Sequence, residues 1–93
     1  VLATLSGVHK GDVEACAFSP DGLSLATVDG WGQLAVWDLK TRKPRRGAVL
    51  GTKGGGLLEG VAFSPDSKIV MVGQREGNVY FRDAKTLEEV QSI

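Results

Sequence analysis

The sequence predicts an all-β protein made of two copies of a small antiparallel sheet. Three observations lead to this prediction. The segment FSPDGLSLATVDGWGQLAVWD returns in altered form 45 residues later as FSPDSKIVMVGQREGNVYFRD. The apolar runs are only four to six residues long, which is the length of strands rather than helices. Glycine, proline, aspartate or asparagine bounds these runs, as expected where tight turns join strands.

The composition allows one small domain and indicates no polyanionic or membrane partner. Of the 93 residues, 42% are hydrophobic, and 11 basic residues balance 11 acidic ones. Nucleic acid and anionic membranes are therefore not expected as partners. No apolar run is long enough to span a bilayer, and no signal peptide pattern opens the chain. The single cysteine fits a cytoplasmic or nuclear location. Since no initiator methionine is present, we expect a processed, excised or engineered piece.

Each repeat is expected to contain four strands in a meander. In the first unit the candidate strands are VEACAF (13–18), LSLATV (23–28), QLAVW (33–37) and PRRGAVL (44–50). In the second unit they are LEGVAF (58–63), KIVMVG (68–73), NVYF (78–81) and LEEVQSI (87–93). The inner strands are almost continuously apolar, which predicts sheets covered on both faces. The last strand of each unit is charged, as a solvent-facing edge should be.

The turn after the first strand has a defined chemistry. In SPDG, Pro20 presets φ at the second position, Asp21 can bond the backbone, and Gly22 tolerates positive φ. In the second unit Ser67 takes the place of this glycine. The sequence therefore predicts a strained or shifted turn there. A small sheet covered on both faces, with a polar outer strand, is what a propeller blade requires.

These features resemble the WD-repeat β-propeller family over essentially the whole chain. Gly7-Val8-His9 resembles the family's Gly-His pair with one residue inserted, and SPDG and Trp37-Asp38 follow the family spacing. The second unit is degenerate, because Gly54 stands where His would be and Arg82-Asp83 replaces Trp-Asp. The resemblance implies two four-stranded antiparallel blades. Residues 1–50 would form a leading outer strand and the first blade, and residues 51–93 the second.

The family often carries a buried hydrogen-bond chain from Trp through Ser or Thr and His to Asp. By resemblance, Trp37, Thr27 and His9 are structural residues of the first blade. Trp31 stands in the place of the Asp, and Asp29, two residues away, could substitute only if the turn is rearranged. The second unit cannot form the chain, since the matching positions hold Arg82, Val72, Gly54 and Glu76. These blades are thus expected to depend more on apolar packing than the family pattern does.

No constellation of catalytic residues is present. His9 and Cys16 are the single histidine and cysteine, and both are assigned structural roles, with Cys16 pointing into the sheet packing. No His or Cys spacing indicates a metal site. Lys53-Gly54-Gly55-Gly56 lacks the ending of a phosphate loop. Asp38 and Asp83 are expected to serve turns. The sequence predicts a protein that is no enzyme and has no cofactor; a hydrolase or redox propeller is the distant alternative.

Trp31 is the main candidate for recognition. It replaces an Asp in a turn near one rim of the blade, and tryptophans make good anchors. The alternative is that Trp31 folds back onto its own or the next blade. Four further candidates for protein binding are expected on the same rim: Arg75 and Glu76 at the matching turn, and Asp12 and Lys53 in the loops between blades.

The run KTRKPRR, residues 40–46, has five positive charges in seven positions. It could bind nucleic acid, an acidic protein or a nuclear import receptor. The favoured alternative is a solvated turn and edge strand, where Lys and Arg also block edge pairing. No aromatic residues interleave the charges, which argues against single-stranded nucleic acid.

Two blades alone leave two apolar faces uncovered, because each blade needs a neighbour on both faces. Closed propellers have about four to eight blades. The sequence therefore predicts homo-oligomerisation into a ring, with four chains making eight blades and three chains as the second choice; otherwise the chain is part of a longer one. The predicted function is a protein-interaction scaffold, with another protein bound at the rim. The alternative is a designed or evolutionary fragment whose only activity is self-assembly.

Overall fold

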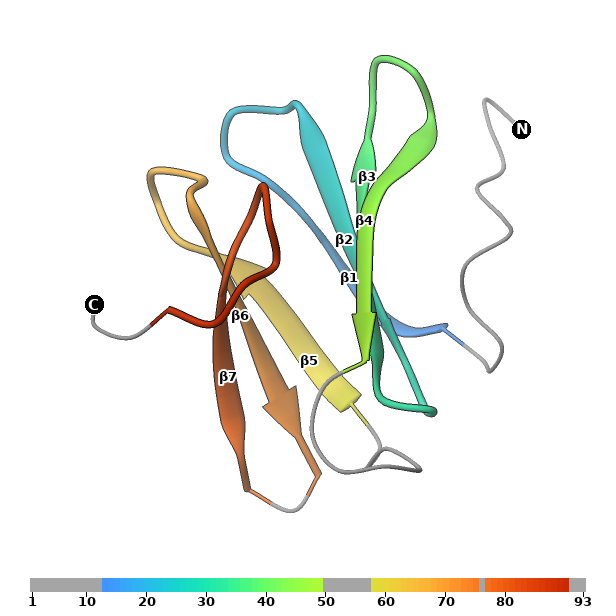
Figure 1. Cartoon of the computed structure of the whole chain (residues 1–93), viewed down its shortest axis with the longest axis vertical. Coiled ribbons are helices and arrows are strands. Elements are labelled where there is room, and N and C mark those ends of the chain that lie inside the picture. Colours follow the sequence, from blue (N-terminus) through green and yellow to red (C-terminus); the bar gives the residue numbers. More distant parts are fainter. Residues whose placement is uncertain (1–12, 50–57, 76, 91–93) are drawn as a thin grey trace.

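A computed structural model describes residues 13–49, 58–75 and 77–90, which form two antiparallel sheets (Figure 1). The first sheet has the order β1-β2-β3-β4 and contains β1 (Val13–Phe18), β2 (Ser24–Asp29), β3 (Gln33–Asp38) and β4 (Lys43–Val49). The second has the order β5-β6-β7 and contains β5 (Leu58–Phe63), β6 (Ile69–Gln74) and β7 (Val79–Asp83). The all-β prediction is confirmed, and these seven strands lie within one or two residues of their predicted places.

The second sheet has three strands where the sequence predicted four. After β7, the described chain returns to it through an isolated bridge between Arg82 and Glu89, with hydrogen bonds from Asp83 N to Glu88 O (2.9 Å) and from Val90 N to Phe81 O (3.0 Å). The Arg82 guanidinium Nη1 donates to the Leu87 carbonyl over 3.1 Å. The Leu87 carbonyl, where the outer strand was expected to begin, thus accepts a hydrogen bond from a side chain. Residues 91–93, the rest of that predicted strand, lie outside the described residues.

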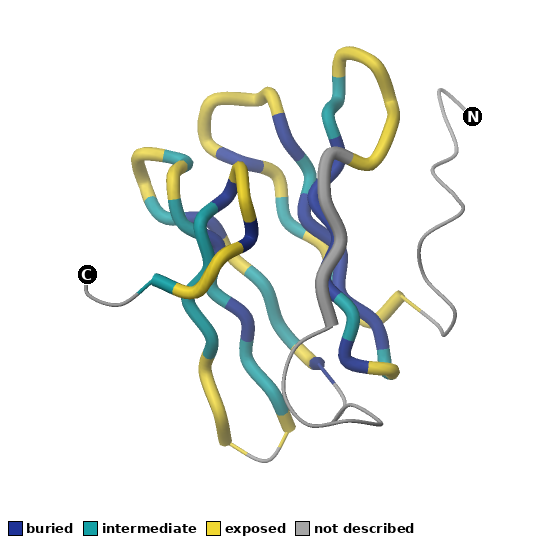
Figure 2. Tube along the Cα trace, in the orientation of Figure 1, coloured by how far each residue is buried: buried dark blue, intermediate teal, exposed yellow. Residues whose placement is uncertain are grey.

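The hydrophobic core lies between the two sheets. It is made by alternate residues of the strands, since successive side chains of a strand point to opposite faces. The first sheet contributes Ala26, Val28, Leu34 and Val36, and the second contributes Leu58, Phe63, Val70 and Val72, with Ala84 and Leu87 after β7. β5 lies against β1 and β2. Burial is most continuous along β2 and β3, the interior strands of the first sheet (Figure 2).

β1 has one covered face, which corrects the prediction for Cys16. Ala15 and Ala17 are half-buried and pack against the core, whereas Glu14, Cys16 and Phe18 are exposed. β1 is an edge strand of the first sheet, and its odd-numbered alanines face the second sheet. The side chain of Cys16 must therefore lie on the opposite face, where described residues do not cover it.

The turns after β1 and β5 have the same hydrogen bonds. Asp21 Oδ1 accepts a bond from Leu23 N (3.0 Å), and Asp66 Oδ1 accepts one from Lys68 N (3.0 Å). Gly22 has φ 77° and Ser67 has φ 65°. The second turn is thus strained rather than shifted. Ser67 adopts the same left-handed conformation as Gly22, and this conformation is unfavourable for a residue with a Cβ.

Ser67 also links the two turns, since its Oγ accepts a hydrogen bond of 3.1 Å from Asp21 N. Ser67→Ala should remove this bond and keep the strained Cβ, whereas Ser67→Gly should remove both. We expect the glycine variant to be more stable than the alanine variant by about 1 kcal/mol in urea unfolding. Gly22→Ser is the control. It should lose a similar amount through strain alone, because a Cβ there meets no atom within 4 Å. Equal stabilities of the two Ser67 variants would contradict this account.

Candidate functional site

The turns that join β2 to β3 and β6 to β7 lie at the same end of the two sheets (Figure 1). We call this end the Trp31 rim, after the residue in the first of these turns. Trp31 is 60% exposed, so more than half of its surface is left uncovered by this part of the chain. Arg75 begins the second turn. Four other predicted residues lie outside the described residues: His9, Asp12, Lys53 and Glu76.

Asp29 shapes the turn that carries Trp31. It is fully buried, and its Oδ1 accepts hydrogen bonds from Trp31 N and Gln33 N, both of 2.9 Å. Gly32 completes the turn with φ 84°. The carboxylate thus satisfies two backbone donors and fixes the turn that carries Trp31. From the sequence, Asp29 was expected only as a substitute for the missing Asp of the hydrogen-bond chain. Its role could have been predicted from its position directly before Gly30-Trp31-Gly32, since Asp side chains commonly bond the backbone two residues on.

The first sheet contains the Trp-to-Thr link of the family's hydrogen-bond chain. Trp37 Nε1 donates to Thr27 Oγ1 over 2.9 Å, and both residues are buried. In the second sheet Arg82 occupies the position of Trp37. Its Nε is buried with no hydrogen-bond partner among the described residues. Apolar packing with Val70 and Val72 therefore holds that sheet in place of a polar chain.

Asp38 and Asp83 each close the turn that follows them. Asp38 Oδ1 accepts bonds from Lys40 N (2.8 Å) and Thr41 N (3.1 Å). Asp83 Oδ1 accepts bonds from the two matching amides, of 2.8 and 3.0 Å. The backbone N–H of Lys85, followed by that of Thr86, lowers the pKa of the Asp83 carboxyl below its ordinary value. Both aspartates thus have local structural contacts.

Arg75 forms an ion pair with Glu59 of β5, with Nε and Oε2 3.3 Å apart. Both side chains are largely exposed, and exposed pairs of this kind contribute little to stability. The pair holds the Arg75 guanidinium near the Trp31 rim, with one carboxylate already bound to it.

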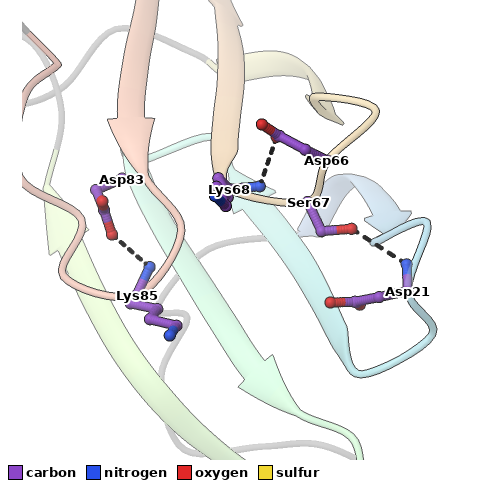
Figure 3. Close-up of a pocket in the computed structure, with 6 residues that line it drawn as sticks. All are labelled: Asp21, Asp66, Ser67, Lys68, Asp83 and Lys85. Atoms are coloured by element: carbon purple, nitrogen blue, oxygen red, sulfur yellow. Dashed lines mark hydrogen bonds between the residues drawn. The ribbon is translucent and has the colours of Figure 1, made fainter.

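A groove of about 400 Å³ lies at the opposite rim, and the sequence analysis did not predict it. It is lined by Asp21, Asp66, Ser67, Lys68, Asp83 and Lys85 (Figure 3). The hydroxyl of Ser64, followed by the backbone N–H of Lys68, lowers the pKa of Asp66. The repeated SPD turn could have indicated this groove, because packed sheets with the same fold place equivalent turns side by side. Between residues 13 and 90, the described part holds no group of His, Cys, Asp or Glu arranged to bind a metal.

Two packed antiparallel sheets with these capped turns define the class: the fold is that of β-propeller blades. The family model described as "WD domain, G-beta repeat" matches residues 1–38. The solved RRP9 WD40 repeats superpose with a TM-score of 0.82 at 14% identity, over 96% of this chain and 27% of that one. The structure of U3-55K superposes with a TM-score of 0.82 at 15% identity, over 96% of this chain and 28% of that one. The predicted resemblance to the WD-repeat family is confirmed, and the two sheets are blades of the WD40 type.

Curated relatives give the same result. The chain is 41% identical over 69 residues to "WD repeat-containing protein 26 homolog" of Drosophila melanogaster, covering 70% of this chain and 11% of that protein. It is 39% identical over 66 residues to "Cilia- and flagella-associated protein 52" of Mus musculus, covering 69% and 10%. The chain thus spans about a tenth of these relatives. WD40 propellers generally act as non-enzymatic scaffolds for protein interaction. Within the described ranges, no helix is long and apolar enough to cross a membrane.

Proposed function

We propose that this chain is a two-blade unit of a protein-interaction scaffold, which completes a closed propeller with copies of itself and binds a partner protein at the Trp31 rim. Four chains making eight blades are our first expectation and three chains the second. The division into residues 1–50 and 51–93 falls between β4 and β5. We place the protein in the cytoplasm or nucleus, a location that the single cysteine supports.

The observation that carries the proposal is the open face of the second sheet. Val70 and Val72 are buried toward the first sheet, so the alternate residues of β6 face away from it. On this outer face Met71 pairs with Phe81 and Gly73 with Val79. Met71 and Phe81 are only half-buried, and Val79 is 58% exposed. Apolar side chains in adjacent strands without a covering layer mark a surface that another element is expected to cover.

On the first sheet, the side of β1 that faces away from the second sheet is also exposed. Phe18 is 68% exposed, and exposed Cys16 lies on the same side of β1, because residues two apart in a strand share a face. This side faces away from the second sheet. Thr27, Ala35 and Trp37 lie on the same face in β2 and β3 but are buried, so the exposed strip is confined to β1. This strip and the open face of the second sheet lie on opposite sides of the two-sheet unit, as head-to-tail ring closure requires.

Native mass spectrometry of the purified chain at several concentrations tests the assembly. A discrete species of three or four chains is expected. A monomer whose β6 and β7 amides exchange rapidly would contradict self-assembly, and the missing blades would then belong to a longer chain.

The binding role is tested separately, by pull-down with identification of the bound proteins. Trp31→Ala should lose a partner that the wild type retains, while the assembly mass is unchanged. Trp31→Phe is the matched control and should retain most of the binding, since it keeps an aromatic anchor. A wild-type ring that retains no partner would favour the alternative, a fragment whose only activity is self-assembly.

A further inference from the structure

The hairpin between β3 and β4 carries positive charge that no described residue neutralises. Lys40, Arg42 and Lys43 are exposed, and among the described residues none of them forms an ion pair. Arg45 and Arg46 follow in β4. The carboxylate of Asp38, which precedes the turn, accepts two hydrogen bonds from the backbone of the turn. This hairpin lies at the end of the first sheet opposite the Trp31 rim (Figure 1).

The turn itself does not require these charges, because the chain contains a second copy of it. Arg42 N donates to Asp38 O and Leu87 N donates to Asp83 O, both over 2.7 Å. Arg42 and Leu87 have φ values of 62° and 61°. The second copy nevertheless has buried Leu87 at the position of Arg42, and exposed Glu88 at the position of Lys43. Lys85 repeats the charge of Lys40, but the same backbone forms without a cation at the positions of Arg42 and Lys43. These two cations are therefore not needed to build the turn.

The neighbouring hairpin does not neutralise them either. Glu88 and Glu89 are exposed and belong to the equivalent turn of the adjacent sheet, yet no ion pair among the described residues joins the two hairpins. A ring that repeated this spacing between sheets would leave the same charges unpaired. A partner outside the assembly is thus the expected source of negative charge.

The surroundings favour a short partner over a long polyanion. Three carboxylates and two lysines line the groove on the same rim, namely Asp21, Asp66, Asp83, Lys68 and Lys85, and the chain has no net charge. An extended nucleic acid would meet these carboxylates, whereas a segment of a few acidic residues would contact the hairpin alone. We propose that the exposed hairpin of Lys40, Arg42 and Lys43 docks a short acidic segment of a partner protein. This surface is separate from the Trp31 rim and does not depend on the function proposed there.

Fluorescence anisotropy with a labelled peptide of alternating glutamate and glycine tests this site on the full chain. Lys40→Gln/Lys43→Gln removes two charges and leaves Arg42 in place. It should weaken binding about fivefold, since each exposed pair contributes modestly. Lys68→Gln/Lys85→Gln is the charge-matched control on the same rim and should change the affinity less than about twofold. Circular dichroism should show that both variants keep the wild-type fold.

Three outcomes would overturn the proposal. Equal losses in the two double variants would show that only net charge matters. Tighter binding of a single-stranded oligonucleotide of equal charge, lost in the Lys40 and Lys43 variant, would assign the hairpin to nucleic acid. No binding of the peptide at low salt, where exposed charges interact most strongly, would remove the site altogether.

Discussion

Replacing Leu34 with alanine is expected to lower the free energy of unfolding by about 3 kcal/mol. Leu34 is fully buried in β3 and belongs to the core that joins the two sheets, together with Leu58 and Val72. The substitution removes buried methyl groups and leaves a cavity that rigid neighbouring strands fill only in part. Urea unfolding followed by circular dichroism, at one fixed chain concentration, measures the loss.

Leu23→Ala is the matched control, because it deletes the same atoms from a side chain that is 61% exposed. Its expected cost is below about 0.5 kcal/mol. If the two leucine variants lost equal stability, packing between the sheets would not be what holds this unit together. A change in denaturant sensitivity without a change in midpoint would instead indicate altered compactness of one state.

Asp29→Ala is expected to cost about 2–3 kcal/mol. The buried carboxylate accepts bonds from Trp31 N and Gln33 N, and its removal leaves these backbone donors without that acceptor inside a tight turn. Asp29→Asn should lose less, since the amide Oδ1 can still accept the bonds from both backbone donors. The same urea experiment gives both values. The fluorescence of Trp31 should also change in the alanine variant, because its turn is no longer fixed.

Asp66→Ala serves as the control for this prediction. The Asp66 carboxylate also makes two local bonds, with Ser64 Oγ and Lys68 N, but it is exposed. Water replaces such partners readily, so the expected cost is below about 1 kcal/mol. A loss as large as that of Asp29→Ala would mean that burial does not distinguish the two turns.

The places where prediction and structure differ share a cause. Strand positions follow from short apolar runs and turn residues, which are local properties, and they were predicted well. The exposure of Cys16 depends on which face of β1 meets the second sheet, and apolar identity alone does not indicate that face. After β7, the Arg82 side chain bonds the Leu87 carbonyl, a contact with no sequence signature. The groove at the opposite rim exists because two turns far apart in sequence meet.

The sequence by itself determined the repeat, the strand order within each unit and the chemistry of the turns, because these depend on residues close together in the chain. Tertiary structure alone decided that Asp29 is buried, that Ser67 bonds Asp21 across the two sheets, and that Asp21, Asp66 and Asp83 line one groove. These features arise from packing between units. They depend on the distances between residues far apart in the sequence, and local sequence patterns do not determine those distances.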